Sequence, residues 1–111
     1  LRSPDPSANP YLAFAGCLAA GMDGIKNKLT PPASVDKNIY TMTQEEKDSL
    51  GIQNLPTSLE EAIKALEENE LIKKVLGVDS FHKYINAKKE EWKQYSQQVT
   101  RWETDEYLHR V

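Results

Sequence analysis

The hydrophobic residues of this 111-residue sequence are distributed unevenly, and this limits what the chain can fold into. They are concentrated between Tyr11 and Ile25, and the remainder include scattered aromatic residues after Phe81. Charged residues make up 28% of the chain and the mean hydropathy is -0.65, so only a thin core can form. We therefore expect one domain at most, and a segment that completes its hydrophobic core against other protein.

The strongest helix signal follows a proline-rich start. Asn9 is a favourable N-cap, and Pro10 comes next, at the first helical position, where its missing N–H costs nothing. Apolar residues then recur at helical spacing, which predicts a helix from Pro10 to about Lys28. Little of its circumference is polar before Asp23, so we expect this helix to be buried on most sides. Its three glycines suggest close approach of another backbone: Gly16, Gly21 and Gly24.

The rest of the chain predicts shorter helices, a loop over residues 30–40, one long helix and no strand. Capping boxes, with Ser or Thr three positions before Glu, mark three helix starts: Thr43/Glu46, Ser58/Glu61 and Thr100/Glu103. The predicted helices cover 44–50, a segment with its apolar face at 59, 62, 63 and 66, then 70–76, a long helix from Asp79 or Ser80 to about 97, and 101–110. The apolar stripe of the long helix is Phe81, Tyr84, Ile85, Lys88, Trp92, Tyr95 and Val99. The sequence therefore predicts an all-α segment.

The charge balance argues against a nucleic-acid surface, because the net charge is -3 and the pI is near 5.4. Four lysines recur on one predicted helix with glutamates among them, so we expect a solvated face: Lys83, Lys88, Lys89 and Lys93. The longest apolar stretch, Tyr11 to Met22, is too short to span a bilayer, and residues 1–10 do not resemble a signal peptide. Neither nucleic acid nor membrane is expected as a partner.

The sequence contains a single cysteine, Cys17, which excludes an internal disulfide and a cysteine-based zinc site. It lies in the apolar helix, where we expect a buried and unreactive thiol. One unpaired cysteine fits a reducing, cytoplasmic setting.

No catalytic constellation is visible residue by residue. His82 and His109 are isolated and lack the spacing of metal ligands. Two pairs of adjacent carboxylates fall on polar helix faces and cannot face one another as acid/base pairs: Glu60-Glu61 and Glu67-Glu68. There is no G-x-x-x-x-G-K-[ST] loop and no G-x-S-x-G motif. Without further context these residues indicate a freestanding helical interaction module.

Blocks of sequence along the chain carry a family resemblance. The first three are Arg2-Ser3-Pro4-Asp5, Asn9-Pro10-Tyr11-Leu12-Ala13-Phe14-Ala15 and Asp23-Gly24-Ile25-Lys26-Asn27-Lys28. Their order and spacing resemble R-x-E-x-R-x-P-D-x-x-x-N-P-Y-L-A-F-A of class I glutamine synthetases, which closes the active site, and a following helix that ends near G-I-K-N-K. Later blocks resemble the same family: Asp36-Lys37-Asn38-Ile39-Tyr40, Ser58-Leu59-Glu60-Glu61-Ala62, Gln98-Val99-Thr100 and Trp102-Glu103. The chain resembles the carboxy-terminal segment of such an enzyme over essentially its whole length.

This resemblance implies a parent enzyme that ligates ammonia to L-glutamate through γ-glutamyl phosphate, using ATP and Mg²⁺ or Mn²⁺. One position, Arg2, matches an active-site residue of the family, which contacts the glutamate substrate and the transferred phosphoryl group. A guanidinium can stabilise charge on phosphoryl oxygens and hold a carboxylate through two hydrogen bonds. The first arginine and the metal-binding glutamate of R-x-E-x-R are expected just before Leu1. The chain alone is therefore expected to be inactive and to bind no cofactor.

The same resemblance divides the chain into three parts. Residues 1–28 correspond to the end of an active-site strand and a buried helix, 29–57 to a loop with a short helix, and 58–111 to a helical tail, without the β-strands of the catalytic domain. Tyr40 corresponds to a tyrosine that one subclass adenylylates. The short stretch from Thr57 to Tyr84 and the tail instead resemble the alpha subclass, which glutamine and nitrogen-regulatory proteins control. We therefore expect Tyr40 to be unmodified.

The tail has two interpretations. Glutamine synthetases form a homododecamer of two hexameric rings, and the resemblance implies that residues 101–111 insert into a subunit of the opposite ring. Alternatively, the tail folds back on the long helix of its own chain against Trp92 and Tyr95. Both interpretations use the apolar side that Trp102, Tyr107 and Leu108 give to the last predicted helix.

Overall fold

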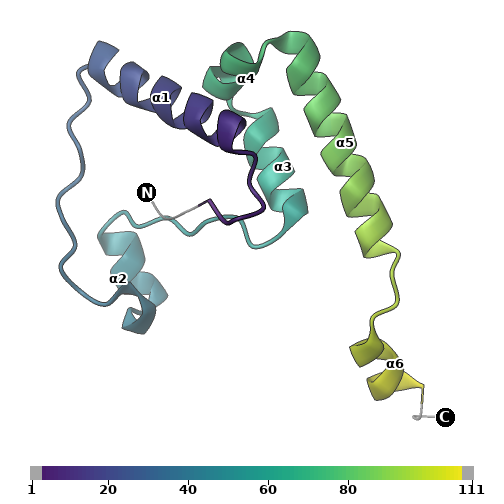
Figure 1. The fold of residues 1–111 in the computed structure, drawn as a ribbon. Helices are drawn as coiled ribbons and strands as arrows, with labels where there is room; N and C mark the ends of the chain where they lie inside the picture. The colour runs from purple at the N-terminus through teal and green to yellow at the C-terminus, as the bar shows by residue number, and fades with distance from the viewer. Residues whose placement is uncertain (1–3, 109–111) are drawn as a thin grey trace. The chain divides into compact units, whose positions relative to one another are not determined.

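The computed structural model describes residues 4–108, and every regular element within them is helical. Along the chain these are α1 (Pro10–Lys26), the 3₁₀ helix η1 (Ile39–Thr41), α2 (Gln44–Ser49), α3 (Leu59–Glu67), α4 (Glu70–Leu76), α5 (Val78–Ser96) and α6 (Arg101–Tyr107) (Figure 1). The all-α prediction is confirmed. The chain separates into an N-terminal unit, Leu1–Pro56, and a C-terminal unit, Thr57–Val111.

Helix α1 begins and ends through local hydrogen bonds. The Asn9 side chain accepts from the backbone N–H groups of Tyr11 and Leu12 at 3.0 and 3.3 Å, which confirms the predicted cap. At the other end the Leu29 N–H donates to the Gly24 carbonyl at 2.9 Å, and Lys28 takes a φ of 52°. This left-handed closure is a Schellman motif, so the helix ends at Lys26, two residues before the predicted end.

The expected burial of α1 is wrong within this chain, because none of its residues is buried. Leu12 is 37% exposed, and the other large apolar side chains of the helix are exposed by 57 to 84%: Tyr11, Phe14, Leu18, Met22 and Ile25. Cys17 is also exposed, where a buried thiol was expected. No atom lies within 4 Å of a Cβ built on Gly21 or Gly24, so this chain does not supply the expected close backbone. That other protein covers this apolar helix stays a prediction.

The loop after α1 and the short helix α2 also follow local signals. Residues 30–40 were expected to form an extended loop, but η1 interrupts its end because the Asn38 side chain accepts from the Tyr40 N–H at 3.1 Å. The capping box of α2 is formed, because the Glu46 carboxylate accepts from the Thr43 N–H at 2.9 Å and the Thr43 hydroxyl accepts from the Glu46 N–H at 3.3 Å. Gly51, at φ 67°, ends this helix as predicted.

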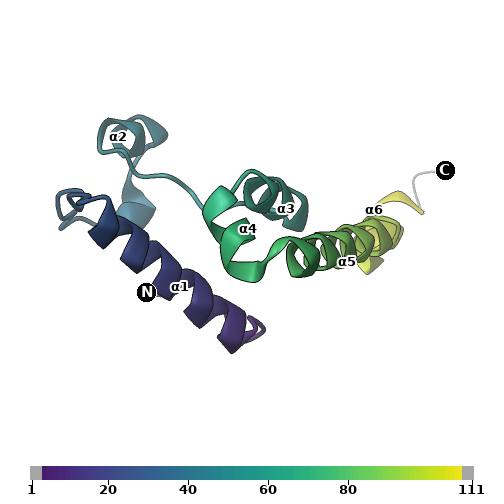
Figure 2. The same cartoon turned by 90° about the horizontal axis from the view of Figure 1, so that it is seen from above.

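The C-terminal unit packs three helices against one another. Helices α3, α4 and α5 share a small core of Ile63, Phe81 and Ile85, with Leu59, Leu66, Leu76 and Trp92 partly buried around it. Figures 1 and 2 show α3 and α5 side by side and running in opposite directions, with α4 joining them at one end. The predicted stripe of α5 is therefore only partly correct, since Tyr95 and Val99 remain exposed.

One helix start and one capping bond in this unit differ from the predictions. Helix α5 begins at Val78, ahead of the predicted Asp79 or Ser80, because Gly77 at φ 75° turns the chain directly out of α4. The Ser58 hydroxyl caps α3, but the Glu61 carboxylate accepts from the Thr57 N–H at 2.8 Å, one residue before the cap. The predicted capping box is therefore only half formed, because the Glu61 carboxylate bonds the backbone of Thr57 in place of that of Ser58.

Candidate functional site

The predicted catalytic residue Arg2 lies outside the described residues, and the structure begins with the segment that follows it. In this segment Asp5 starts a β-turn, with the Ala8 N–H donating to the Asp5 carbonyl at 3.1 Å and Pro6 at the second position. Asp at the first and Pro at the second position are the preferred residues of a type I turn. The turn leads directly to Asn9, which caps α1.

The Asp5 side chain is the centre of this turn. Its Oδ1 accepts from the Ser7 backbone N–H at 2.7 Å and from the Ser7 hydroxyl at 2.5 Å. These two hydrogen bonds, the hydroxyl first, lower the pKa of Asp5 below its usual value, so the carboxylate is ionised near neutral pH. Every residue from Pro4 to Pro10 is exposed, so local bonds and proline rings hold the segment in place of packing.

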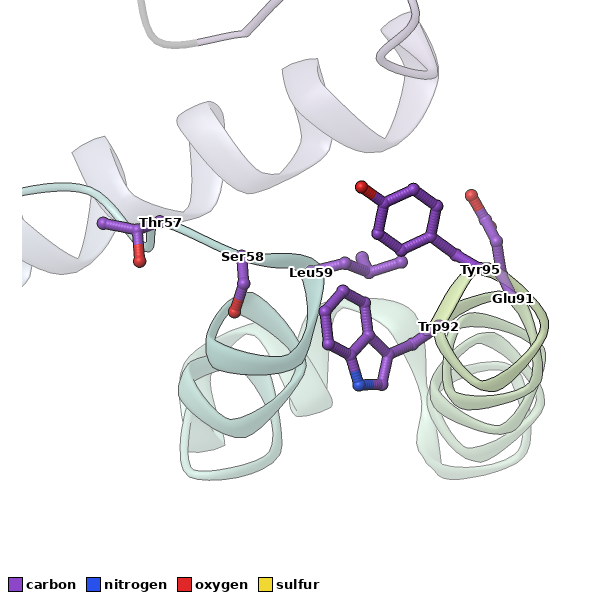
Figure 3. A pocket seen from close by; sticks show the side chains of 6 residues that line it. All are labelled: Thr57, Ser58, Leu59, Glu91, Trp92 and Tyr95. Atoms are coloured by element: carbon purple, nitrogen blue, oxygen red, sulfur yellow. The ribbon is translucent and has the colours of Figure 1, made fainter. Parts of the chain in front are cut away.

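A second feature was not foreseen from sequence. An open groove of about 540 Å³ lies between the start of α3 and the end of α5, lined by Thr57, Ser58, Leu59, Glu91, Trp92 and Tyr95. In Figure 3 the side chains of Leu59, Trp92 and Tyr95 lie close together between α3 and α5. The centroids of the Trp92 and Tyr95 rings are 5.7 Å apart. Glu91 at its edge pairs with Lys88 at 2.6 Å, which raises the pKa of the lysine. The groove joins residues 57–59 to residues 91–95, which are more than thirty positions apart in the sequence, so no local pattern predicts it.

The remaining candidate side chains have structural roles in the described part of the chain. Glu60 pairs with Lys64 at 3.9 Å, and Glu67 pairs with Lys89 at 2.5 Å across α3 and α5. His82 lies beside the Phe81 ring, with centroids 5.7 Å apart, and His109 lies outside the described residues.

Tyr40, which the family resemblance predicts to correspond to a modified tyrosine of one subclass, lies in η1 and is 99% exposed. That Tyr40 is unmodified stays a prediction.

The tail helix α6 has the predicted capping box, in which the Glu103 carboxylate accepts from the Thr100 N–H at 2.7 Å. This bond, together with one from the Thr100 hydroxyl, lowers the pKa of Glu103. The Trp102 ring packs edge-on against Tyr107, with centroids 5.9 Å apart, and Trp102 is 65% exposed. The fold-back interpretation places the tail against Trp92 and Tyr95. Within residues 4–108 these two rings contact each other, and no ring contact joins Trp102 to either of them.

Within residues 4–108 no three His, Cys, Asp or Glu side chains come together as a group able to hold a metal ion. Over the same residues no helix has the length and apolar character needed to cross a membrane.

Comparisons with known proteins cover almost the whole chain. Residues 1–107 match the family described as "Glutamine synthetase, catalytic domain". The chain is similar to the glutamine synthetase of Staphylococcus aureus strain MW2, with 53% identity over 108 residues that make up 97% of this chain and 24% of that protein. It is 51% identical to the glutamine synthetase of Thermotoga maritima, over 97% of this chain and 25% of the relative.

A solved structure, "Apo GmaS without ligand", is also similar. It matches 98% of this chain and 25% of its own with a TM-score of 0.75 and 38% identity. The chain thus spans about a quarter of the length of the proteins that it matches.

Proposed function

Since this chain belongs to the glutamine synthetase family, we propose that it forms the carboxy-terminal part of an enzyme that ligates ammonia to L-glutamate in an ATP-dependent reaction. The observation that carries this proposal is the match of 107 residues to the catalytic domain, with identity above 50% to two bacterial synthetases. The alternative of a freestanding interaction module is not favoured, because the match to the catalytic domain extends over residues 1–107.

The active-site contribution that we assign to this segment is Arg2. In the proposed reaction a glutamate carboxylate is phosphorylated, and negative charge develops on the oxygens of the transferred phosphoryl group. A guanidinium at this point holds a carboxylate through paired hydrogen bonds and stabilises that charge as it develops.

The family implies ATP and Mg²⁺ or Mn²⁺ in the full enzyme. Residues 4–108 do not fit a metal site, because no three candidate ligands come together in them. We therefore propose that the metals and the nucleotide are held by other parts of the enzyme, and we assign no step to them here. It follows that the 111-residue chain alone should form no glutamine.

The test of this function uses the full-length synthetase that carries this segment. We expect Arg2→Ala to lower kcat and kcat/KM together, by about 3 kcal/mol in transition-state stabilisation, while the KM for ATP changes little. Near-normal turnover in this variant would remove Arg2 from the active site. Glutamine formation by the isolated chain would contradict the division of labour.

We further propose a homododecamer in which α6 clasps the opposite ring. Support comes from the exposure of Trp102 and from the length of α6, since seven residues do not form a stable lone helix in water. Burying one tryptophan in a neighbour would contribute about 2–3 kcal/mol per tail. Deleting residues 102–111 from the full-length enzyme should split dodecamers into hexamers in light scattering. A truncated enzyme that stays dodecameric at low concentration would favour the fold-back alternative.

Regulation and location follow from the same family assignment. We propose a cytoplasmic enzyme controlled by glutamine and by nitrogen-regulatory proteins, with Tyr40 unmodified. Intact mass measurement of the enzyme from its own cells tests the last point, since adenylylation adds one AMP to each modified subunit.

A further inference from the structure

We draw no further inference here: the strongest candidate, the open groove between the start of α3 and the end of α5 beside Leu59, Trp92 and Tyr95, carries no proposal because nothing in residues 4–108 shows what covers it.

Discussion

Helices α1 and α5 differ in burial, and the more hydrophobic of the two is the less buried. Helix α1 is the more apolar of the two, yet none of its residues is buried. Helix α5 carries many charged residues, yet Phe81 and Ile85 are each only 3% exposed. The difference lies in the neighbours, because short connections bring α3 and α4 onto α5, while a long loop follows α1. Burial in this chain depends on which partner helix is available, more than on how hydrophobic a helix is.

The chain matches glutamine synthetases over 97% of its own length but over only about a quarter of each relative. The C-terminal unit supplies its own small core, whereas the apolar side chains of α1 are exposed in the part of the chain that the structure describes. We infer that the rest of the catalytic domain covers α1, and that α3, α4 and α5 hold together without it.

The largest expected effect comes from removing a core ring. Phe81→Ala should destabilise the C-terminal unit by about 3–5 kcal/mol, which is enough to unfold so small a core. The matched control is Phe14→Ala in α1, which is 75% exposed and should change stability by no more than about 0.5 kcal/mol in the isolated chain. Urea denaturation followed by circular dichroism measures both. Equal losses in the two variants would break the contrast between the helices.

Smaller effects on stability are expected from replacing two glycines, and the two replacements should act in opposite directions. Gly77 joins α4 to α5 at φ 75° and ψ 149°, a region open almost only to glycine, so Gly77→Ala should cost about 1–3 kcal/mol. Gly24 lies in α1 with open space where a Cβ would stand, so Gly24→Ala should stabilise the helix by up to about 1 kcal/mol. Thermal melts of the two variants in the isolated chain should therefore shift in opposite directions. A stabilising Gly77→Ala would show that the turn is not strained.

The smallest expected effect is a loss of α3 stability at acid pH. Hydrogen bonds from the Thr57 N–H and then its hydroxyl hold the pKa of Glu61 below its ordinary value of 4.5. The contribution of this carboxylate to α3 is therefore present above pH 4.5 and is lost as the pH falls through the lower, folded pKa. Helix α1 has the neutral cap Asn9, so its start should not titrate.

Amide chemical shifts test this difference between pH 7 and pH 2. The Thr57 amide should titrate with a midpoint below 4.5, while the Tyr11 amide should not. Glu61→Gln keeps an acceptor for Thr57 without the charge and should abolish the titration. A Tyr11 amide that titrates like Thr57 would contradict the separation of the two caps.

Local signals in the sequence predicted most of the helix boundaries, and tertiary features escaped them. Residues 70–76 form the predicted helix with the predicted bounds, because Asn69 and Gly77 mark both ends. The start of α5 was missed because a glycine at positive φ allows two helices to follow one another directly. The groove beside Trp92 was missed because it depends on how α3 and α5 pack. Arg2 came from the family likeness alone, since nothing in its neighbours points to catalysis.

The central claim is that α3, α4 and α5 hold together by themselves, whereas α1 is covered by other protein. Hydrogen exchange tests it most directly, measured by mass spectrometry on the isolated chain and on the full-length enzyme. In the isolated chain, amides of α1 should exchange rapidly, while those of α3 and α5 around Ile63 and Phe81 should be the most protected. In the full-length enzyme α1 should become strongly protected, because the remainder of the catalytic domain covers its apolar face. Helix α1 exchanging equally fast in both proteins would contradict the account.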